Sequence, residues 1–238
     1  MKVQGGKPVY GAAVGILMLD THFPRIPGDI GNATTFPFPV HYKVVRGASP
    51  DRVVLRKGEG LIGAFIEAAR ELEAEGVRGI TTSCGFLSAF QEDLTEAVSI
   101  PVVTSSLMQV DLVNRMLRPG KRAGILTISS SNLTETHLAK AHVPLDTPVG
   151  STEGGKEFTP AVLGNRTELD VALAREDNIE AARRLQRDHP DVGAIVLECT
   201  NMTPFAVDIG AATGLPVYSI VTLVNWFQAS LAPERYAV

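Results

Sequence analysis

The sequence predicts an α/β protein with two pseudo-symmetric domains, each built on a parallel sheet and related to the other by internal duplication. Three observations lead to this fold class. Short apolar runs rich in Val and Ile alternate with segments of helical periodicity, the pattern of parallel strands covered by helices. Segments of the second half repeat segments of the first half in the same order. The two cysteines, Cys84 and Cys199, are equivalent positions of that repeat.

The apolar runs are predicted as strands because each is followed by turn-forming or small polar residues. They cover residues 12–19, 42–48, 79–83, 100–105, 122–129, 193–198 and 215–220. Helices are expected in most of the gaps. Apolar residues recur at the spacing of one helix face in residues 61–76. A second clear helix is predicted for residues 169–188, before His189 and Pro190.

Residues 20–40 form a long segment with several prolines and no periodicity. A loop of this length inside a compact domain is often a lid over a functional site, and a proline-rich surface connection is the alternative. If the loop is a lid, Asp20 and Thr21 at its base are expected to lie near the ligand, because the loop starts at the carboxyl end of a strand.

The internal repeat is found by comparing the chain with itself. Residues 76–90 and 191–205 align at an offset of 115 and share Val77/Val192, Ile80/Ile195, Cys84/Cys199 and Phe90/Phe205. Residues 66–72 and 179–185 match at an offset of 113, and residues 14–20 and 123–129 at an offset of 109. Matches in one order with slowly rising offsets indicate a duplication.

The duplication predicts the domain organisation. One α/β lobe comprises residues 1–105 together with 218–238, and the other comprises residues 106–217. Open parallel sheets bind ligands at the carboxyl ends of their strands. Two lobes facing each other across a pseudo-twofold axis therefore form one interdomain cleft, with a cysteine on each wall.

Composition restricts the class of protein. The 238 residues carry a net charge of −4, with 45% hydrophobic and 20% charged residues, which is an ordinary globular composition. The sequence has no basic stripe for nucleic acid, and its longest early apolar run, residues 10–19, is too short to span a membrane. Two widely separated cysteines argue against a disulfide scaffold, so a cytoplasmic protein is expected. The sequence leaves open whether the protein forms a homo-oligomer.

The cysteines have two interpretations. A lone cysteine is commonly a small buried hydrophobe, but paired placement at equivalent strand ends favours functional thiols. Each precedes a helix start, where backbone N–H groups and the helix dipole lower a thiol pKa from about 8.5. Metal is disfavoured because neither cysteine has a histidine or second cysteine at ligand spacing. The lysines lie away from the cysteine strand ends, so neither metal nor pyridoxal cofactor is expected.

Two opposed thiols suit proton transfer at a carbon next to a carboxylate. One thiolate removes an α-proton from one side, and the opposite thiol delivers a proton from the other side, which inverts the centre. The substrate carboxylate needs donors that strengthen as enolate character develops. The candidates are backbone amides after each cysteine and a set of polar side chains: Ser83, Ser129, Ser131, Thr200 and Asn201.

These motifs together resemble the aspartate/glutamate/hydantoin racemase superfamily. The resemblance rests on TSCGF (82–86), ECTNM (198–202), the GILMLD strand ending at Asp20 and the GILTISSS strand. It implies a cofactor-independent enzyme with Cys84 and Cys199 as acid/base thiols and a small carboxylate bound between two domains. It also implies substrate-binding roles for Asp20, Ser131 and Thr200.

Some positions differ from the glutamate-type pattern. Gly85 and Phe86 follow the first cysteine in place of Asn and Thr, and Asn201 replaces a frequent His. Gly85 resembles the hydantoin-type members, while Phe86 and the phenylalanines of residues 20–40 indicate a less polar pocket. An amino-acid or amino-acid-derivative racemase is therefore expected.

Two alternatives remain. A lyase or isomerase of the same superfamily would start with the same α-proton abstraction, and the sequence does not separate it from a racemase. A non-enzymatic small-carboxylate-binding protein could also pair two α/β lobes around a ligand. A nucleotide-dependent enzyme is disfavoured because the sequence has neither GxGxxG after a strand nor GxxxxGK.

Overall fold

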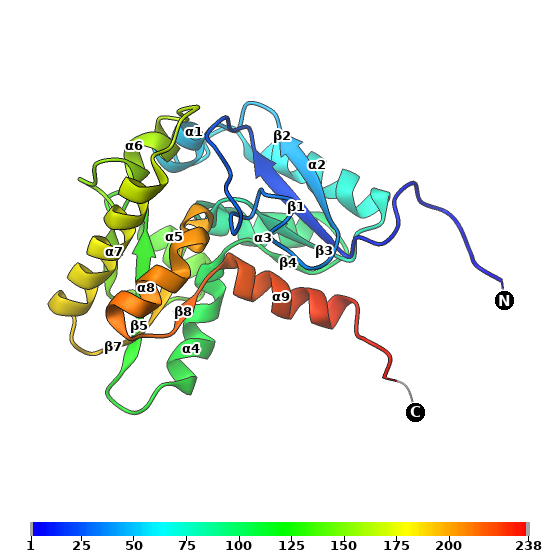
Figure 1. Cartoon of the computed structure of the whole chain (residues 1–238). Coiled ribbons are helices and arrows are strands. Elements are labelled where there is room, and N and C mark those ends of the chain that lie inside the picture. Colours follow the sequence, from blue (N-terminus) through cyan, green and yellow to red (C-terminus); the bar gives the residue numbers. More distant parts are fainter. Residues whose placement is uncertain (1, 237–238) are drawn as a thin grey trace.

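The computed structural model describes residues 2–236 and contains two parallel sheets. The first is formed by β1 (Val14–Leu19), β2 (Val40–Val45), β3 (Gly79–Thr82) and β4 (Val102–Val103). The second is formed by β5 (Arg122–Thr127), β6 (Val149–Ser151), β7 (Val192–Leu197) and β8 (Val217–Tyr218). Their orders, β2-β1-β3-β4 and β6-β5-β7-β8, correspond strand by strand. Strands β1 to β4 lie in a different part of the molecule from β5, β7 and β8 (Figure 1). The predicted α/β fold with two related halves is confirmed.

Helices connect the parallel strands. Those that precede β5 in the chain are α1 (Pro50–Val54), α2 (Ile62–Glu75), α3 (Gln91–Ala97) and α4 (Val110–Met116). Those that follow β5 are α5 (Glu135–Lys140), α6 (Phe158–Leu163), α7 (Val171–Asp188), α8 (Ala206–Thr213) and α9 (Ile220–Leu231). Helices α2 and α7 are the two segments with the clearest helical periodicity. Asp170 begins α7 by accepting hydrogen bonds from the N–H groups of Ala172 and Leu173.

The predicted strands are all present, several with shifted or narrower bounds. The run at 215–220 contributes only Val217 and Tyr218 to the sheet, because Ser219 caps the following helix α9. Strand β6 was not predicted. Its three half-buried residues pair only with β5, at an edge of the sheet, and do not form an apolar run.

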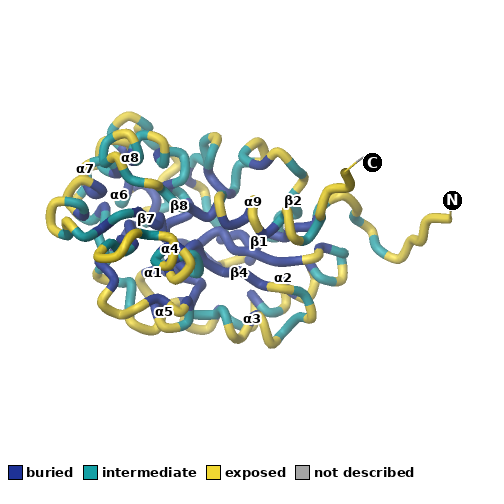
Figure 2. The backbone as a smooth tube through the Cα atoms, turned by 90° about the horizontal axis from the view of Figure 1, so that it is seen from below, coloured by how far each residue is buried: buried dark blue, intermediate teal, exposed yellow. Residues whose placement is uncertain are grey.

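The central strands are buried on both faces. β1 is buried along its whole length, as are β3 and the last four residues of β7 (Figure 2). Helix α9 packs on the first sheet, where Val224 and Phe227 join a core cluster with Val14 and Ile16. Another cluster contains residues of both sheets, including Leu17, Ile195 and both cysteines. The two halves therefore share apolar packing around the cysteines.

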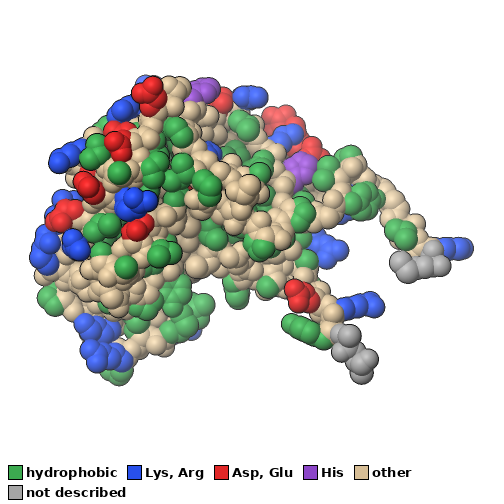
Figure 3. All heavy atoms as spheres, in the orientation of Figure 1, with side chains coloured by type: hydrophobic (Ala, Val, Ile, Leu, Met, Phe, Trp, Pro, Cys, Tyr) green, Lys and Arg blue, Asp and Glu red, His purple; other side chains and the backbone are tan. Residues whose placement is uncertain are grey.

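The surface has a mixed polar character in the view of Figure 3. Acidic and basic side chains are interspersed over the helices of the second half, with apolar side chains between them. No helix within residues 2–236 combines the length and apolarity needed to cross a bilayer.

Candidate active site

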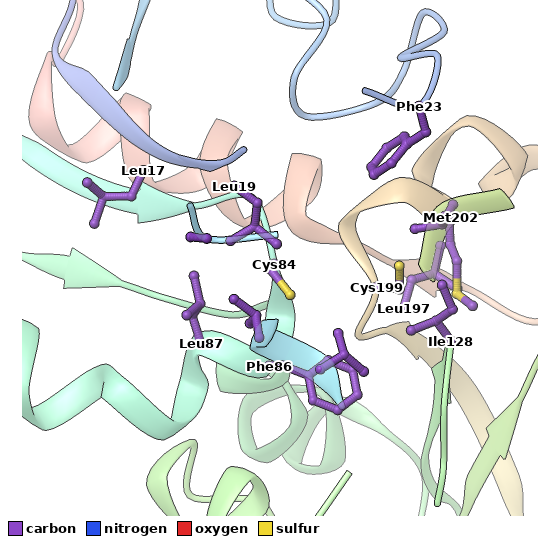
Figure 4. Close-up of a cluster of buried hydrophobic side chains, with 14 of the residues drawn as sticks. Leu17, Leu19, Phe23, Cys84, Phe86, Leu87, Ile128, Leu197, Cys199 and Met202 are labelled. Carbon is purple, nitrogen blue, oxygen red and sulfur yellow. The ribbon is translucent and has the colours of Figure 1, made fainter. Parts of the chain in front are cut away.

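The cysteines occupy equivalent positions after central strands. Cys84 follows β3 and caps the 3₁₀ helix η1 (Gly85–Phe90), while Cys199 follows β7 and caps η3 (Thr200–Phe205). Both are buried and reduced. Figure 4 shows the two sulfur atoms entering the same space from opposite sides, beneath the loop that carries Phe23.

A narrow pocket surrounds the thiols. Its empty volume is about 350 Å³, which includes space open to solvent. Most of the predicted site residues line this pocket, namely Ser83, Cys84, Gly85, Phe86, Cys199, Thr200 and Asn201. The remaining walls include Phe23, Ile128 and Val162. These residues make the pocket largely apolar.

The thiols are weaker acids than the sequence predicts. Burial, followed by the nearby Glu198, raises the pKa of Cys84 to about 12, although the backbone N–H groups of Phe86 and Leu87 act in the opposite direction. Burial and Glu198 also raise the pKa of Cys199. The helix-start amides are present as expected, but desolvation outweighs them, and the prediction of lowered thiol pKa values is wrong.

The 20–40 loop closes one side of the pocket. Phe23 and Arg25 line the pocket. The Asn201 amide donates to Asp29 Oδ2 at 2.7 Å and thereby joins the loop to η3. Gly28 has a φ of +96°, and a Cβ there would lie 3.0 Å from the Pro204 Cα. This close approach requires glycine at the place where the loop meets η3.

Arg25 supplies a cation that the sequence analysis did not identify. Its guanidinium donates to Asp29 Oδ1 at 2.7 Å and Thr21 Oγ1 at 3.0 Å, and lies 4.7 Å from the Phe23 ring centre. Its positive charge partly opposes the rise in the pKa of Cys84 that burial and Glu198 cause. The signal was available, because Arg25 is the single basic residue other than histidine in the 20–40 segment.

Glu198 is the second pocket residue that was missed as a functional candidate. Its side chain lines the pocket directly beside Cys199, and it is fully buried. Burial raises its pKa to about 8, and a hydrogen bond from Thr127 only partly opposes this effect. A charged residue at the end of the apolar run 193–198 was the sequence signal.

Asp20 and Thr21 do not line the pocket. The Asp20 carboxylate accepts the Gly47 N–H at 3.1 Å and contacts Arg46, so it fixes the turn after β2. Thr21 accepts a hydrogen bond from Arg25 and so acts on the pocket only through that side chain. Their polar atoms serve local contacts in this structure, and the role of both residues in substrate binding stays a prediction.

Ser129 and Ser131 are also outside the pocket lining. Their hydroxyls donate to Glu153 Oε1, and Ser130 donates to Oε2 through its N–H and its hydroxyl. Partial burial acts to raise the pKa of Glu153, but these hydrogen bonds lower it to about 2. The serines thus bind a carboxylate of the chain itself, and their role as substrate donors stays a prediction.

The sequence matches a known protein family and is similar to named enzymes. The sequence model of the Asp/Glu/Hydantoin racemase family matches residues 53–226. The dimethylsulfoniopropionate lyase of Durusdinium sp. clade D is 31% identical over 222 residues, covering 91% of this chain and 74% of the relative. Dimethylsulfoniopropionate lyase 7 of Emiliania huxleyi is 29% identical over 240 residues, covering 92% and 67%.

Two solved structures illustrate the shared fold. Glutamate racemase isoform RacE1 from Bacillus anthracis has a TM-score of 0.60 and 19% identity, covering 94% of this chain and 85% of that chain. Unliganded arylmalonate decarboxylase has a TM-score of 0.56 and 16% identity, covering 94% of both chains. At this level of identity the likeness concerns the fold alone.

Proposed function

The chain belongs to the Asp/Glu/hydantoin racemase family, and we propose that it is a lyase that removes a β-leaving group from a small carboxylate without a cofactor. The leaving group favoured is a dialkyl sulfide, as in dimethylsulfoniopropionate. The observation that carries this choice is the likeness to named dimethylsulfoniopropionate lyases, one of them 31% identical across 91% of the chain. The lyase alternative is therefore preferred to the racemase expected from sequence.

The proposed reaction begins as a racemisation would. A cysteine thiolate takes the α-proton, and the C–H electron pair moves toward the carboxylate as enolate character develops. The electron pair then forms the C=C bond as the C–S bond breaks. The sulfur leaves with the C–S electrons, so a sulfonium substrate gives a neutral sulfide and an unsaturated carboxylate. Because the sulfide leaves neutral, no second acid is needed for its departure.

The charges of the pocket support a zwitterionic substrate. Arg25 is the basic residue of the pocket wall and would bind the carboxylate. A sulfonium placed near the thiols would favour the thiolate, because an opposite charge within about 4–6 Å stabilises the ionised form. Binding would then release the thiol proton to solvent, which offsets the high thiol pKa of the empty pocket. Phe86 offers an aromatic surface for the cation.

One observation favours racemisation as the second candidate. Cys84 and Cys199 enter the pocket from opposite sides at equivalent strand ends, and this symmetry suits two bases that act on two enantiomers. Elimination needs only one strong base, so it predicts unequal roles for two similar thiols.

The experiment compares the two reactions directly. The protein and its Cys84→Ser and Cys199→Ser variants are incubated with dimethylsulfoniopropionate, and sulfide release is measured by gas chromatography. Parallel incubations in D₂O with L- and D-amino acids and hydantoins follow α-deuterium by NMR. We expect sulfide release by the unaltered protein and strongly unequal losses in the two variants.

Two results would contradict the proposal. Racemisation without sulfide release, with each variant failing on a different enantiomer, would identify a racemase. Unchanged sulfide release in both variants would exclude the thiols as bases and return the cysteines to a packing role.

A further inference from the structure

Glu198 presents an unsatisfied polar atom to the thiol pocket. Its Oε2 accepts a hydrogen bond from the Thr127 hydroxyl at 2.7 Å. Its Oε1 is buried and has no hydrogen-bond partner among the described residues. Since buried polar atoms are nearly always paired, an unpaired oxygen in a pocket wall points to a ligand that completes the bond.

The position of Oε1 is fixed by Gly85. A Cβ at residue 85 would collide with both the carbonyl oxygen and Oε1 of Glu198, so only glycine leaves room for this carboxyl group. Gly85 directly follows Cys84, and Glu198 directly precedes Cys199. The carboxyl group therefore lies where the two cysteine motifs meet.

The groups around Glu198 favour its neutral form. Both thiols face the same pocket, and their raised pKa values keep them neutral when the pocket is empty. Strand β5 contributes the Thr127 hydroxyl. From the loop, the Arg25 charge is paired with Asp29 at 2.7 Å. An ionised carboxylate buried here without its own cation would be strongly unfavourable. The pKa of about 8 agrees with a protonated group at neutral pH.

We propose that Glu198 acts as a neutral carboxylic acid whose Oε1–H donates a hydrogen bond to the substrate carboxylate and strengthens it as the enolate forms. The inference rests on the proposed α-proton abstraction but applies equally to elimination and to racemisation. Glu198 transfers no proton: the α-proton goes to the thiolate, and the hydrogen bond stabilises the charge that develops on oxygen. Arg25 binds the same carboxylate as a cation.

Ionisation of Glu198 opposes catalysis in three ways. The hydrogen-bond donor is lost, and the new negative charge repels the enolate. It also disfavours the thiolate, because the charge of Glu198 raises the pKa of both cysteines. Activity is therefore expected to fall as pH rises through about 8, the pKa of Glu198.

The test uses Glu198→Gln and Glu198→Leu in the full chain. The glutamine amide keeps a donor of similar shape, so Glu198→Gln should stay within about tenfold of the original kcat and lose the alkaline decline. Glu198→Leu should lose roughly 10²–10³ in kcat, the loss typical for one oxyanion donor. Glu157→Gln is the matched control, because Glu157 is also buried but bonds to Asp170 and Arg166 outside the pocket.

Infrared difference spectroscopy provides a readout that does not depend on the substrate. The unaltered protein should show a protonated-carboxyl band at pH 7 that disappears above pH 8 and is absent in Glu198→Gln. If that band is missing, the proposal is wrong. A second pair of results would also contradict the proposal: a higher KM in Glu198→Gln, together with activity of the unaltered protein that increases through pH 8. These results would show that Glu198 is an ionised carboxylate that binds the sulfonium group of the substrate.

The two proposals fail separately. A protein that releases no sulfide but exchanges α-deuterium with another carboxylate contradicts the proposed lyase function. In that case the same variants are compared by their exchange rates. Equal loss of exchange in Glu198→Gln and Glu198→Leu would overturn the donor role of Glu198, whichever carboxylate is used.

Discussion

The Thr200 hydroxyl donates a hydrogen bond to the Ser83 carbonyl across the two halves of the molecule, with 2.6 Å between the two oxygens. Both residues are buried and adjacent to the cysteines. The Ser83 hydroxyl in turn accepts the Leu19 N–H at 2.9 Å, which ties the first motif to the end of β1. These bonds hold the two thiol-bearing turns in a fixed relation.

Thr200→Val is expected to destabilise the protein by about 1–3 kcal/mol. Valine retains the shape but leaves the buried Ser83 carbonyl without its donor. Urea unfolding measures the loss, and the Thr203→Val variant serves as control because the Thr203 hydroxyl donates to the Thr200 carbonyl within η3. An unaltered urea midpoint in Thr200→Val would show that the bond contributes nothing to folding.

Arg25→Met is expected to raise KM for a carboxylate substrate by roughly tenfold to a hundredfold. Hydrogen bonds to charged groups contribute about 1.5–3 kcal/mol, and each 1.4 kcal/mol corresponds to a factor of ten. Steady-state kinetics test this, with Arg46→Met as the control because Arg46 is an exposed arginine on Asp20. Equal KM values for the three proteins would show that Arg25 does not bind the substrate carboxylate.

His137 is expected to make stability sensitive to acid. Burial and then the Lys57 charge lower its pKa from 6.5 to about 4 in the folded protein. The unfolded chain therefore binds more protons between these pH values, and folding stability decreases as pH falls from 6.5 to 4. The ring packs edge-on against Phe86 of the pocket, with 5.2 Å between ring centres.

The measurement compares urea midpoints of the unaltered protein and His137→Gln at pH 7 and at pH 4.5. Glutamine can still accept the Thr134 N–H that His137 Nδ1 accepts at 3.1 Å. The variant should lose less stability on acidification than the unaltered protein. Identical losses would place the acid sensitivity elsewhere.

Sequence periodicity was sufficient for the main elements of the fold. β1, β3 and β7 are buried strands, so their apolar runs are continuous and easily read. The repeat made Cys84 and Cys199 equivalent because strand ends in duplicated halves occupy equivalent places. β6 escaped prediction because an edge strand of three half-buried residues leaves almost no hydrophobic pattern.

Only the tertiary structure decided which polar groups reach the pocket. Ser129 and Ser131 follow a central strand, which predicted that they bind substrate. In the structure their hydroxyls donate instead to Glu153, which lies more than twenty positions later in the chain. Arg25 and Glu198 line the pocket because the folded chain packs the 20–40 loop against the strand ends. The thiol pKa values depend on the same packing, because desolvation comes from the whole surrounding wall while local sequence specifies only the neighbouring amides.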